Sequence, residues 1–416
     1  MRTFSLHRLI SVVACFWVFL SAQSTPAAPG GRVLIADNQQ FLALNGTTDN
    51  KGLFKNTYQN VFRPKVAATN LVFPLAQAYS SWNDSENQKE FDNPATYRAA
   101  VSVNKGAWAQ LTWNGEQQKI CQMREVIFND PLKVEVKPGD LIYLRTEISV
   151  PAGGKWSLGP QARGESFDAD PNWTGGGTNS ADDVLLSAKG DFSPLYGLFL
   201  HTSQGVFGEP TTKAEVHPAV ILGDSISPYV LSAAEKIGNA APLMYFGQPG
   251  ETGAHFWNAG SARQKLLGGM EVMMYQYGVN DLRGKQPFAD MKSDAMNTWK
   301  AFKDAGGTRL VVFTSTPLSR STDKWQTVEN QTPDYEPAVR AQWNDFLRGL
   351  DERQAGLEVT LIDTTALLET APNSSLWRLT PEGAPTTDDG VHPNGAGYVW
   401  IEKELGEKIR NAVLNQ

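Results

Sequence analysis

The chain is poor in cysteine. Only two of its 416 residues are cysteines: Cys15 lies in an N-terminal segment that we expect to be removed, which leaves Cys121 alone. A mature chain with one cysteine cannot form an internal disulfide, so its stability has to come from hydrophobic cores. The chain also has only five histidines, and none of them joins a Cys/His cluster with metal-ligand spacing. We therefore predict no metal and no cofactor.

Long runs of one kind of residue are missing as well. The formal net charge is -7 at pH 7, and no basic run offers the electrostatic footprint that nucleic acid or an anionic membrane requires. After residue 30, no segment approaches the roughly 20 apolar residues of a membrane-spanning helix. We therefore expect no nucleic-acid partner and no membrane contact in the mature protein.

The one marked apolar run lies near the N-terminus, within residues 1–30. Arg2 and Arg8 come before "LISVVACFWVFLSA", and the small, proline-containing "QSTPAAPGG" follows it. This order is typical of a cleaved secretory signal peptide, so we expect a secreted protein, extracellular or periplasmic. A lipoprotein site at Cys15 is an alternative, but it would leave the apolar Phe16 to Leu20 in the mature chain.

The rest of the chain divides into two halves of different periodicity. Residues 32–212 contain short runs such as "LKVEVKPGDLIYLRTEISV" broken by Gly, Pro, Asn and Asp, which predicts an all-β accessory domain of sandwich or jelly-roll type. Residues 213–416 alternate apolar strands with helical patterns, which predicts an α/β domain built on a parallel sheet. The predicted strands are Ala219 to Leu222, Leu243 to Phe246, Glu271 to Tyr277, Arg309 to Thr314 and Val359 to Ile362.

Four short motifs in the second half lie after predicted strands or before the last helix. They are Gly223-Asp224-Ser225, "GQPGETG" ending at Gly253, Gly278-Val279-Asn280-Asp281, and Asp389-Gly390-Val391-His392. In open α/β sheets, ligands bind beyond the carboxyl ends of the strands, so these motifs form one candidate site.

Together the motifs supply what acyl transfer needs. Ser225 is the candidate nucleophile, His392 the base that takes its proton, and Asp389 the group that orients the imidazole. The backbone N–H groups of Ser225 and Gly253 and the side-chain amide of Asn280 are the candidate oxyanion donors. Gly250 competes with Gly253 for this role.

These motifs, in this order, resemble the SGNH, or GDSL, hydrolase superfamily over roughly Pro218 to Gln416. The resemblance implies a flavodoxin-like three-layer α/β/α fold, a triad of Ser225, His392 and Asp389, and an oxyanion hole from Ser225, Gly253 and Asn280. The sequence departs from the family pattern at Ser227-Pro228-Tyr229 and at Gln248, which puts the rim of the site and the second donor in doubt.

The remaining polar residues near the motifs have structural explanations. We interpret Asp224 as a brace of its turn, Asp281 and Asp388 as solvated loop acids, and His255 as a capping or surface histidine. Trp108, Trp113, Trp156 and Trp173 in the first half could form a sugar-stacking platform, although aromatic residues at strand spacing are more often core.

The sequence thus predicts a secreted serine esterase acting on a small-molecule or polysaccharide ester. Deacetylation of a carbohydrate is the favoured activity, because export and an added β-rich half suit a polymeric substrate; this inference is an analogy. The alternatives are a lipase or arylesterase of the same superfamily, and a non-catalytic glycan-binding protein on a hydrolase scaffold.

Overall fold

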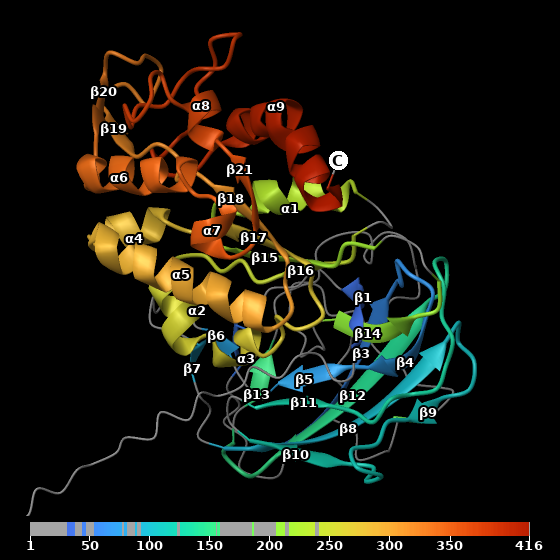
Figure 1. The fold of residues 1–416 in the computed structure, drawn as a ribbon. Helices are drawn as coiled ribbons and strands as arrows, with labels where there is room; N and C mark the ends of the chain where they lie inside the picture. The colour runs from blue at the N-terminus through green and yellow to red at the C-terminus, as the bar shows by residue number, and fades with distance from the viewer. Residues whose placement is uncertain are drawn as a thin grey trace, which may run out of the picture.

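The structure is a computed structural model (Figure 1). It describes residues 31–37, 44–46, 54–76, 79–80, 88–89, 93–122, 125–154, 156–158, 185–186, 205–212, 216–237 and 241–415. The predicted signal peptide, residues 1–30, lies outside the described residues. Within the described part of the chain, no helix combines the length and apolar character needed to cross a membrane.

The described residues before 213 form strands and loops. The strands are β1 (Val33–Asp37), β2 (Leu44–Gly46), β3 (Phe54–Phe62), β4 (Ala68–Val72), β5 (Pro74–Ala76), β6 (Tyr79–Ser80), β7 (Gln88–Lys89), β8 (Ala95–Val103), β9 (Ala109–Gln110), β10 (Lys119–Cys121), β11 (Val126–Phe128), β12 (Ile142–Val150), β13 (Trp156–Leu158) and β14 (Gly205–Pro210).

These strands pair in several small sheets, most of them antiparallel. The longest pairings join β12 to β3 and β8, and a second sheet has the order β1-β14-β4. The turn Pro138-Gly139-Asp140 precedes β12 as the sequence indicates, and Gly139 has a φ of +98° that favours glycine. Because other parts of residues 32–212 lie outside the described residues, an all-β sandwich or jelly roll stays a prediction for this half.

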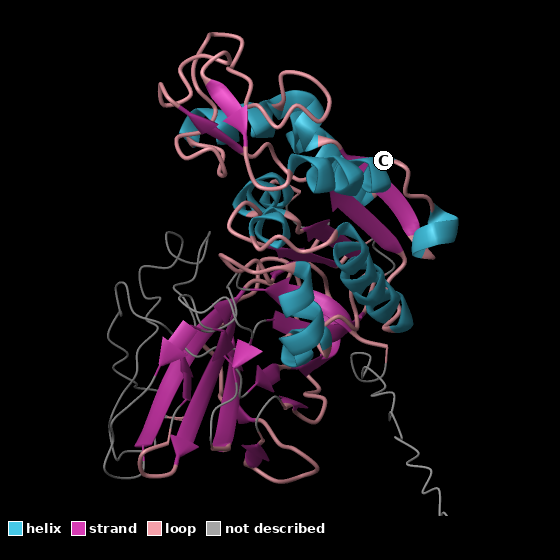
Figure 2. Cartoon of the chain, turned by 90° about the vertical axis from the view of Figure 1, so that its left-hand side faces the viewer, coloured by secondary structure: helices cyan, strands magenta, loops and turns pink. Residues whose placement is uncertain are grey.

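The second half is a mixed α/β structure around one parallel sheet, and Figure 2 shows its helices gathered at one end of the molecule, with the strands of the β-rich half at the other. Its strands are β15 (Ala219–Gly223), β16 (Leu243–Tyr245), β17 (Val272–Gln276), β18 (Arg309–Phe313) and β21 (Glu358–Ile362). Their spatial order, β16-β15-β17-β18-β21, is the 2-1-3-4-5 order of flavodoxin-like sheets. The predicted strands agree with these positions to within one or two residues, because continuous apolar runs suit strands covered on both faces.

Helices cover both faces of this sheet. Near the carboxyl edge lie α4 (Val279–Arg283) and a short hairpin of β19 (Ser319–Ser321) and β20 (Gln331–Pro333). One helical layer contains α1 (Pro228–Glu235), α8 (Thr364–Leu368) and α9 (Gly395–Leu414); the other contains α2 (Gly253–Ala259), α3 (Ser261–Gln264), α5 (Phe288–Asp304), α6 (Pro337–Arg348) and α7 (Glu352–Ala355). Figure 1 shows α1 and α9 on one side of the sheet and α2 and α5 on the other.

The β-rich half meets the second half at the amino ends of the parallel strands. The backbone N–H of Leu243, the first residue of β16, donates to Asp37 Oδ2 at 2.8 Å. The N–H of Leu34 donates to the carbonyl of Gly269, shortly before β17, at 3.2 Å. Phe207 is fully buried in the same hydrophobic cluster as the parallel sheet. The proposed boundary between residues 212 and 213 stays a prediction, and the buried core crosses it.

The shared core leads to a stability prediction. Phe207→Ala removes a buried ring that packs edge-on against Phe128, with 6.3 Å between ring centroids. We expect the free energy of unfolding to fall by about 3–5 kcal/mol, the usual cost of deleting a buried aromatic side chain. Urea unfolding measures this change. The exposed Val399→Ala, at 70% exposure, serves as the control and should change the value by less than about 0.5 kcal/mol. Equal effects of the two substitutions would contradict a shared core.

Candidate active site

The four motifs meet at the carboxyl edge of the parallel sheet. Ser225 follows β15 by two residues, and Asn280 lies in the first turn of α4, directly after β17. The turn after β16 is joined to this edge, because Gln248 N donates to the carbonyl of Gly223 at 2.9 Å. The fourth motif lies just before α9 and reaches Ser225 through His392.

The turn that carries Ser225 is held by its neighbours. Asp224 Oδ1 accepts the N–H of Ile226 at 2.9 Å, and the hydroxyl of Ser227 donates to the Asp224 carbonyl at 2.7 Å. A Cβ on Gly223 would approach the Cβ of Ser227 within 2.6 Å, so the turn requires glycine there. Asp224 thus braces its turn as expected, and burial raises its pKa to about 7.

Ser225, His392 and Asp389 form an unbroken hydrogen-bonded chain. Ser225 Oγ lies 2.7 Å from His392 Nε2, and His392 Nδ1 lies 2.6 Å from Asp389 Oδ2. The side chain of Asp389 is 52% exposed and that of His392 is 35% exposed. The distances satisfy the geometry of a nucleophile, its base and the group that orients the base, and the partial exposure leaves the three side chains open to a ligand.

The second oxygen of Asp389 fixes the loop itself. Asp389 Oδ1 accepts the backbone N–H groups of Val391 and His392, each at 2.8 Å. Although partial burial opposes ionisation, these hydrogen bonds and the one from the imidazole hold the pKa of Asp389 well below its usual range. The carboxylate therefore stays charged at neutral pH, as a group that stabilises an imidazolium must.

Gly253 does not fit the role of oxyanion donor that the sequence suggested for it. It is the first residue of α2, and its N–H donates to the buried Asp281 Oδ1 at 3.0 Å. An amide committed to a carboxylate is not available to a developing negative charge. The structure thus corrects this assignment, and sequence reasoning could not see the contact because it joins residues 28 positions apart.

Gly250, the competing candidate, has a backbone N–H that is available to an oxyanion. Its N–H makes no hydrogen bond within the described residues, and neither does the N–H of Ser225. Gly250 has a φ of +80° in a turn closed by Glu251 N and the Gln248 carbonyl at 3.2 Å. No atom lies within 4 Å of where its Cβ would be, so the turn is open above this residue.

Asn280 ties the two turns together. Its Nδ2 donates to the carbonyl of Glu251 at 3.1 Å and, at the longer distance of 3.3 Å, to Asp224 Oδ2. The amide thus lies between the turn of Gly250 and the turn of Ser225. To donate to an oxyanion near Ser225, Asn280 has to give up the longer contact, to Asp224. A side-chain amide can rotate to do this, whereas the backbone N–H of Gly253 is held in its direction toward Asp281.

A buried ion pair behind the site holds the Gly250 turn in position. Arg263 and Glu251 are both fully or almost fully buried and form a two-pronged pair, with Arg263 Nη1 to Glu251 Oε2 at 2.7 Å. The hydroxyl of Tyr277, just after β17, donates to the same oxygen at 2.6 Å. The sequence analysis missed this pair, since neither residue belongs to a recognisable motif.

Three polar residues near the motifs can now be compared with their sequence-based interpretation. Asp281 is wrongly described as a solvated acid: it is 3% exposed and burial raises its pKa to about 7. Asp388 is exposed and accepts from Asn394 Nδ2 at 2.9 Å, as a loop acid would. His255 is confirmed as a capping residue, because it forms a reciprocal capping box with Thr252 at the start of α2.

Gly390 anchors the acid–base loop, residues 389–392, to the rest of the protein. Its φ is +75°, and a Cβ there would come within 1.9 Å of the Ser319 carbonyl oxygen. The Gly390 carbonyl accepts two hydrogen bonds, from Trp377 Nε1 at 3.0 Å and from Ser319 N at 3.1 Å. Trp377 and Ser319 are therefore supporting residues that the sequence motifs did not reveal.

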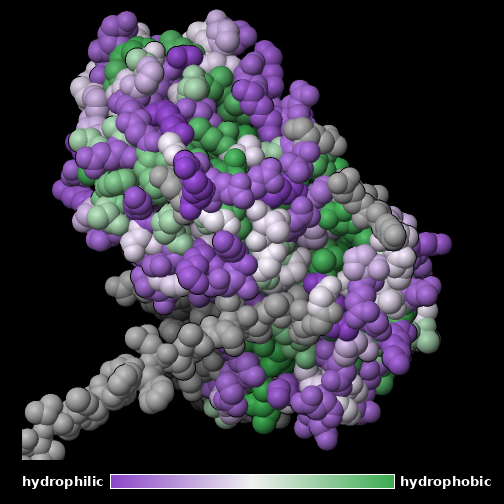
Figure 3. Space-filling model, viewed as in Figure 1, coloured by the Kyte–Doolittle hydropathy of each residue, from purple (hydrophilic) through white to green (hydrophobic). Residues whose placement is uncertain are grey.

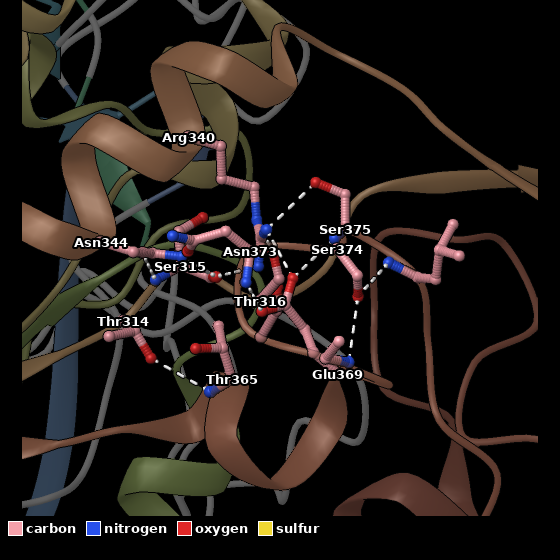
Figure 4. Close-up of polar contacts among 12 residues, drawn as sticks. Thr314, Ser315, Thr316, Arg340, Asn344, Thr365, Glu369, Asn373, Ser374 and Ser375 are labelled. Carbon is pink, nitrogen blue, oxygen red and sulfur yellow. Dashed lines mark hydrogen bonds and ion pairs between the residues drawn. The ribbon is translucent and has the colours of Figure 1, made fainter.

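A pocket of about 580 Å³ lies elsewhere, between α6, α8 and the segment after α8. Its carboxylates are already paired: Arg348 holds Asp363, and the buried Arg340 pairs with Glu369 at 2.6 Å. Figure 4 shows Arg340 reaching toward Ser375 and the 314–316 loop. This network stabilises the segment that leads to Ser319, and the pocket contains no residue of the hydrogen-bonded chain at Ser225.

No protein-family model matches the chain, and no curated protein matches it. Similar solved structures include a carbohydrate esterase family 3 from Talaromyces cellulolyticus (17% identity, TM-score 0.35, covering 48% of this chain and 100% of that one). Others are the psychrotrophic esterase EstA from Pseudoalteromonas sp. (13%, 0.32, 48% and 95%) and a peptidoglycan O-acetylesterase (9%, 0.37, 88% and 79%). Each of these three structures is named as an esterase. Because these similarities are weak, the assignment of function rests on the side chains at Ser225.

The available amides lead to a prediction about a trapped intermediate. If a phosphonate inhibitor is bound covalently to Ser225, its charged oxygen should lie about 2.7–3.1 Å from the N–H groups of Ser225 and Gly250. A crystal structure of the adduct measures both distances. An oxygen bonded to the N–H of Gly253, with Asp281 displaced, would contradict the revised assignment.

The buried Asp281 leads to a prediction about pH. Its pKa is raised to about 7 by burial, so between about pH 4 and pH 7 the folded protein keeps a proton that the unfolded chain has released. The free energy of unfolding should therefore fall as pH rises through this window. Asp281→Asn cannot titrate, and it should lose less stability than the parent protein between pH 5 and pH 8 in urea unfolding. Asp281 also helps to raise the pKa of Asp224, so its replacement by asparagine should reduce the pH dependence that Asp224 contributes as well. Parallel curves for the two proteins would show that Asp281 is not protonated in the folded state.

Proposed function

We propose that the protein is a secreted serine hydrolase of carboxylic esters, with acetyl groups on carbohydrate as its favoured substrate. The observation that carries this proposal is the chain of two hydrogen bonds, 2.7 and 2.6 Å long, from Ser225 through His392 to Asp389. It supports acyl transfer because a serine hydroxyl is a weak nucleophile until a positioned base takes its proton.

The residues support the following reaction. Ser225 Oγ attacks the ester carbonyl carbon while its proton moves to His392 Nε2, and Asp389 stabilises the imidazolium. The carbonyl oxygen becomes negatively charged and is stabilised by the N–H groups of Ser225 and Gly250 and by the amide of Asn280. The intermediate collapses, and the leaving alcohol takes the proton from His392. Water, deprotonated by His392, then attacks the acyl carbon on Ser225. The bond from this carbon to Ser225 Oγ breaks, the carboxylic acid is released, and His392 returns its proton to Ser225 Oγ.

The preference for a short acyl chain is supported by the surface. Among the described residues, the exposed large apolar side chains are Ile120, Leu186 and Val399, and they lie far apart in the sequence. On the face in Figure 3, hydrophilic residues cover most of the helical half and hydrophobic residues show only between them. A site for long acyl chains would favour a contiguous apolar patch. Turnover of p-nitrophenyl esters of rising chain length tests this, and a strong preference for long chains would favour the lipase alternative.

The catalytic assignment is tested by substitution in the triad. Ser225→Ala, His392→Ala and Asp389→Asn should each lower kcat by on the order of 10³-fold or more, because the three groups act as a unit. Asn280→Ala should lower it by roughly 10²-fold, the usual cost of one oxyanion donor. Steady-state kinetics on p-nitrophenyl acetate measure these losses, and urea unfolding checks that the variants are folded.

The chain offers a matched control for Asp389. Asp388→Asn changes the neighbouring exposed acid and should leave kcat near the parent value, since an asparagine oxygen can still accept from Asn394. A fluorophosphonate should label the parent protein and fail to label Ser225→Ala. A folded parent protein that never labels would instead favour the non-catalytic glycan-binding alternative.

A further inference from the structure

The hairpin of β19 and β20 is rigidly built at its tip. Asp323 accepts hydrogen bonds from the hydroxyls of Ser321 and Thr327, each at 2.6 Å, and from Asn330 Nδ2 at 3.0 Å. The hydrogen bonds of these side chains hold the pKa of Asp323 well below its usual range. Figure 1 shows the hairpin at the end of the molecule away from the β-rich half.

Two residues at this tip have a backbone conformation that is unusual for their type. Lys324 has a φ of +62° and Trp325 a φ of +58°. A bulky residue rarely adopts this left-handed region, and such strain persists only where surrounding contacts over-determine it, often at functional sites. Here the contacts are the Asp323 network and the N–H of Trp325, which donates to Ser321 Oγ at 2.8 Å.

The strained turn directs the indole of Trp325 onto the acid–base loop. Trp325 Nε1 donates to Ser319 Oγ at 2.9 Å, which fixes the plane of the ring. The ring lies against Gly390, since a Cβ on Gly390 would come within 2.6 Å of Trp325 Cζ2. Gly390 adjoins Asp389 and is two residues from His392. A partly exposed indole thus borders the candidate triad.

The residues that follow the hairpin contact a second element of the site, the helix α4. Tyr335, which follows β20, lies under the guanidinium of Arg283 at 5.6 Å from the ring centroid. Arg283 is the last residue of α4, the helix that carries Asn280. The segment from Ser319 to Tyr335 therefore contacts both the loop of Asp389 and His392 and the helix of a candidate oxyanion donor.

We propose that Trp325 is a platform on which a sugar ring of the substrate stacks, next to the ester that Ser225 attacks. A pyranose ring has an apolar C–H face, and a rigid indole offers a large flat contact area at a low cost in conformational entropy. This inference rests on the proposed esterase function and names carbohydrate as the alcohol part of its ester.

Five of the other tryptophans fit this role less well. Trp299, Trp343 and Trp377 are almost fully buried, and Trp113 is 4% exposed, so all four are core residues. Trp108 is partly exposed, but the guanidinium of Arg145 lies 4.0 Å from its ring centroid and covers one face. Of the four residues considered as a platform in the first half, Trp173 and the side chain of Trp156 lie outside the described residues.

The test compares two substrates with the full-length protein. Trp325→Ala should raise KM for an acetylated xylo-oligosaccharide by on the order of tenfold, as expected when a stacked ring is lost. The loss of kcat/KM on p-nitrophenyl acetate, which has no sugar ring, should be clearly smaller. Trp325→Phe keeps an aromatic face and should recover most of the affinity. Trp108→Ala is the control and should leave both substrates unaffected.

Binding of unacetylated xylohexaose, measured by calorimetry, gives a readout that does not depend on turnover. It should weaken by a similar factor in Trp325→Ala. Equal losses on both substrates, with unchanged xylohexaose binding, would show that Trp325 only supports the Gly390 loop and would overturn the platform. Unchanged KM on the oligosaccharide would overturn it as well. A protein that binds xylohexaose through Trp325 but is never labelled by a fluorophosphonate would overturn the esterase function and leave the platform standing.

Discussion

The left-handed backbone of Gly390 is the constraint on which the candidate site depends. With a φ of +75°, the loop turns so tightly that Asp389 can accept two backbone N–H groups and the imidazole of His392 at once. The same turn points the Gly390 carbonyl at Trp377 and Ser319. Any side chain at this position would collide with the Ser319 carbonyl. The glycine therefore allows both the hydrogen bonds to Asp389 and the close packing of this loop against Ser319.

Two buried ion pairs give these loops a fixed position. Arg263 with Glu251 lies behind the Gly250 turn, and Arg340 with Glu369 lies behind the loop that leads to Ser319. Burying charges is costly, and a hydrophobic pair of the same size is often as stabilising. An ion pair can also make directed hydrogen bonds to other groups. Arg340 donates to the carbonyl of Thr316 at 2.8 Å and, together with Asn344 Nδ2, to the carbonyl of Ser315, so that these buried carbonyls have partners. Arginine is suited to this task because its donors form a rigid fork.

The sequence was informative where the physics is local. Apolar runs located the five parallel strands, and the residues that follow strand ends located Ser225 and Asn280, since these strand ends must meet at one edge. The Asp389–His392 loop was located by its motif before the last helix. The sequence-based interpretation was wrong for Gly253 and Asp281. Asp281 is buried, and its carboxylate accepts the backbone N–H of Gly253 that was expected to stabilise an oxyanion. The sequence also could not show that Trp325 reaches Gly390, because that contact depends on a strained turn 65 residues earlier in the chain. Contacts between loops of this kind leave no periodic signal.

The described contacts between the β-rich half and the parallel sheet lie at one end of the parallel strands. The β-rich half contacts the parallel sheet at the amino ends of its strands, through Asp37, Leu34 and Phe207. The hydrogen-bonded chain from Ser225 lies at the carboxyl ends. Since the two ends of a parallel strand lie at opposite edges of the sheet, these described contacts add hydrophobic core at the edge away from Ser225. Among the described residues, the β19–β20 hairpin contacts the loop of Asp389 and His392 through Trp325 and Gly390. A change of sequence in this hairpin can therefore alter the surroundings of His392 without replacing Ser225, His392 or Asp389.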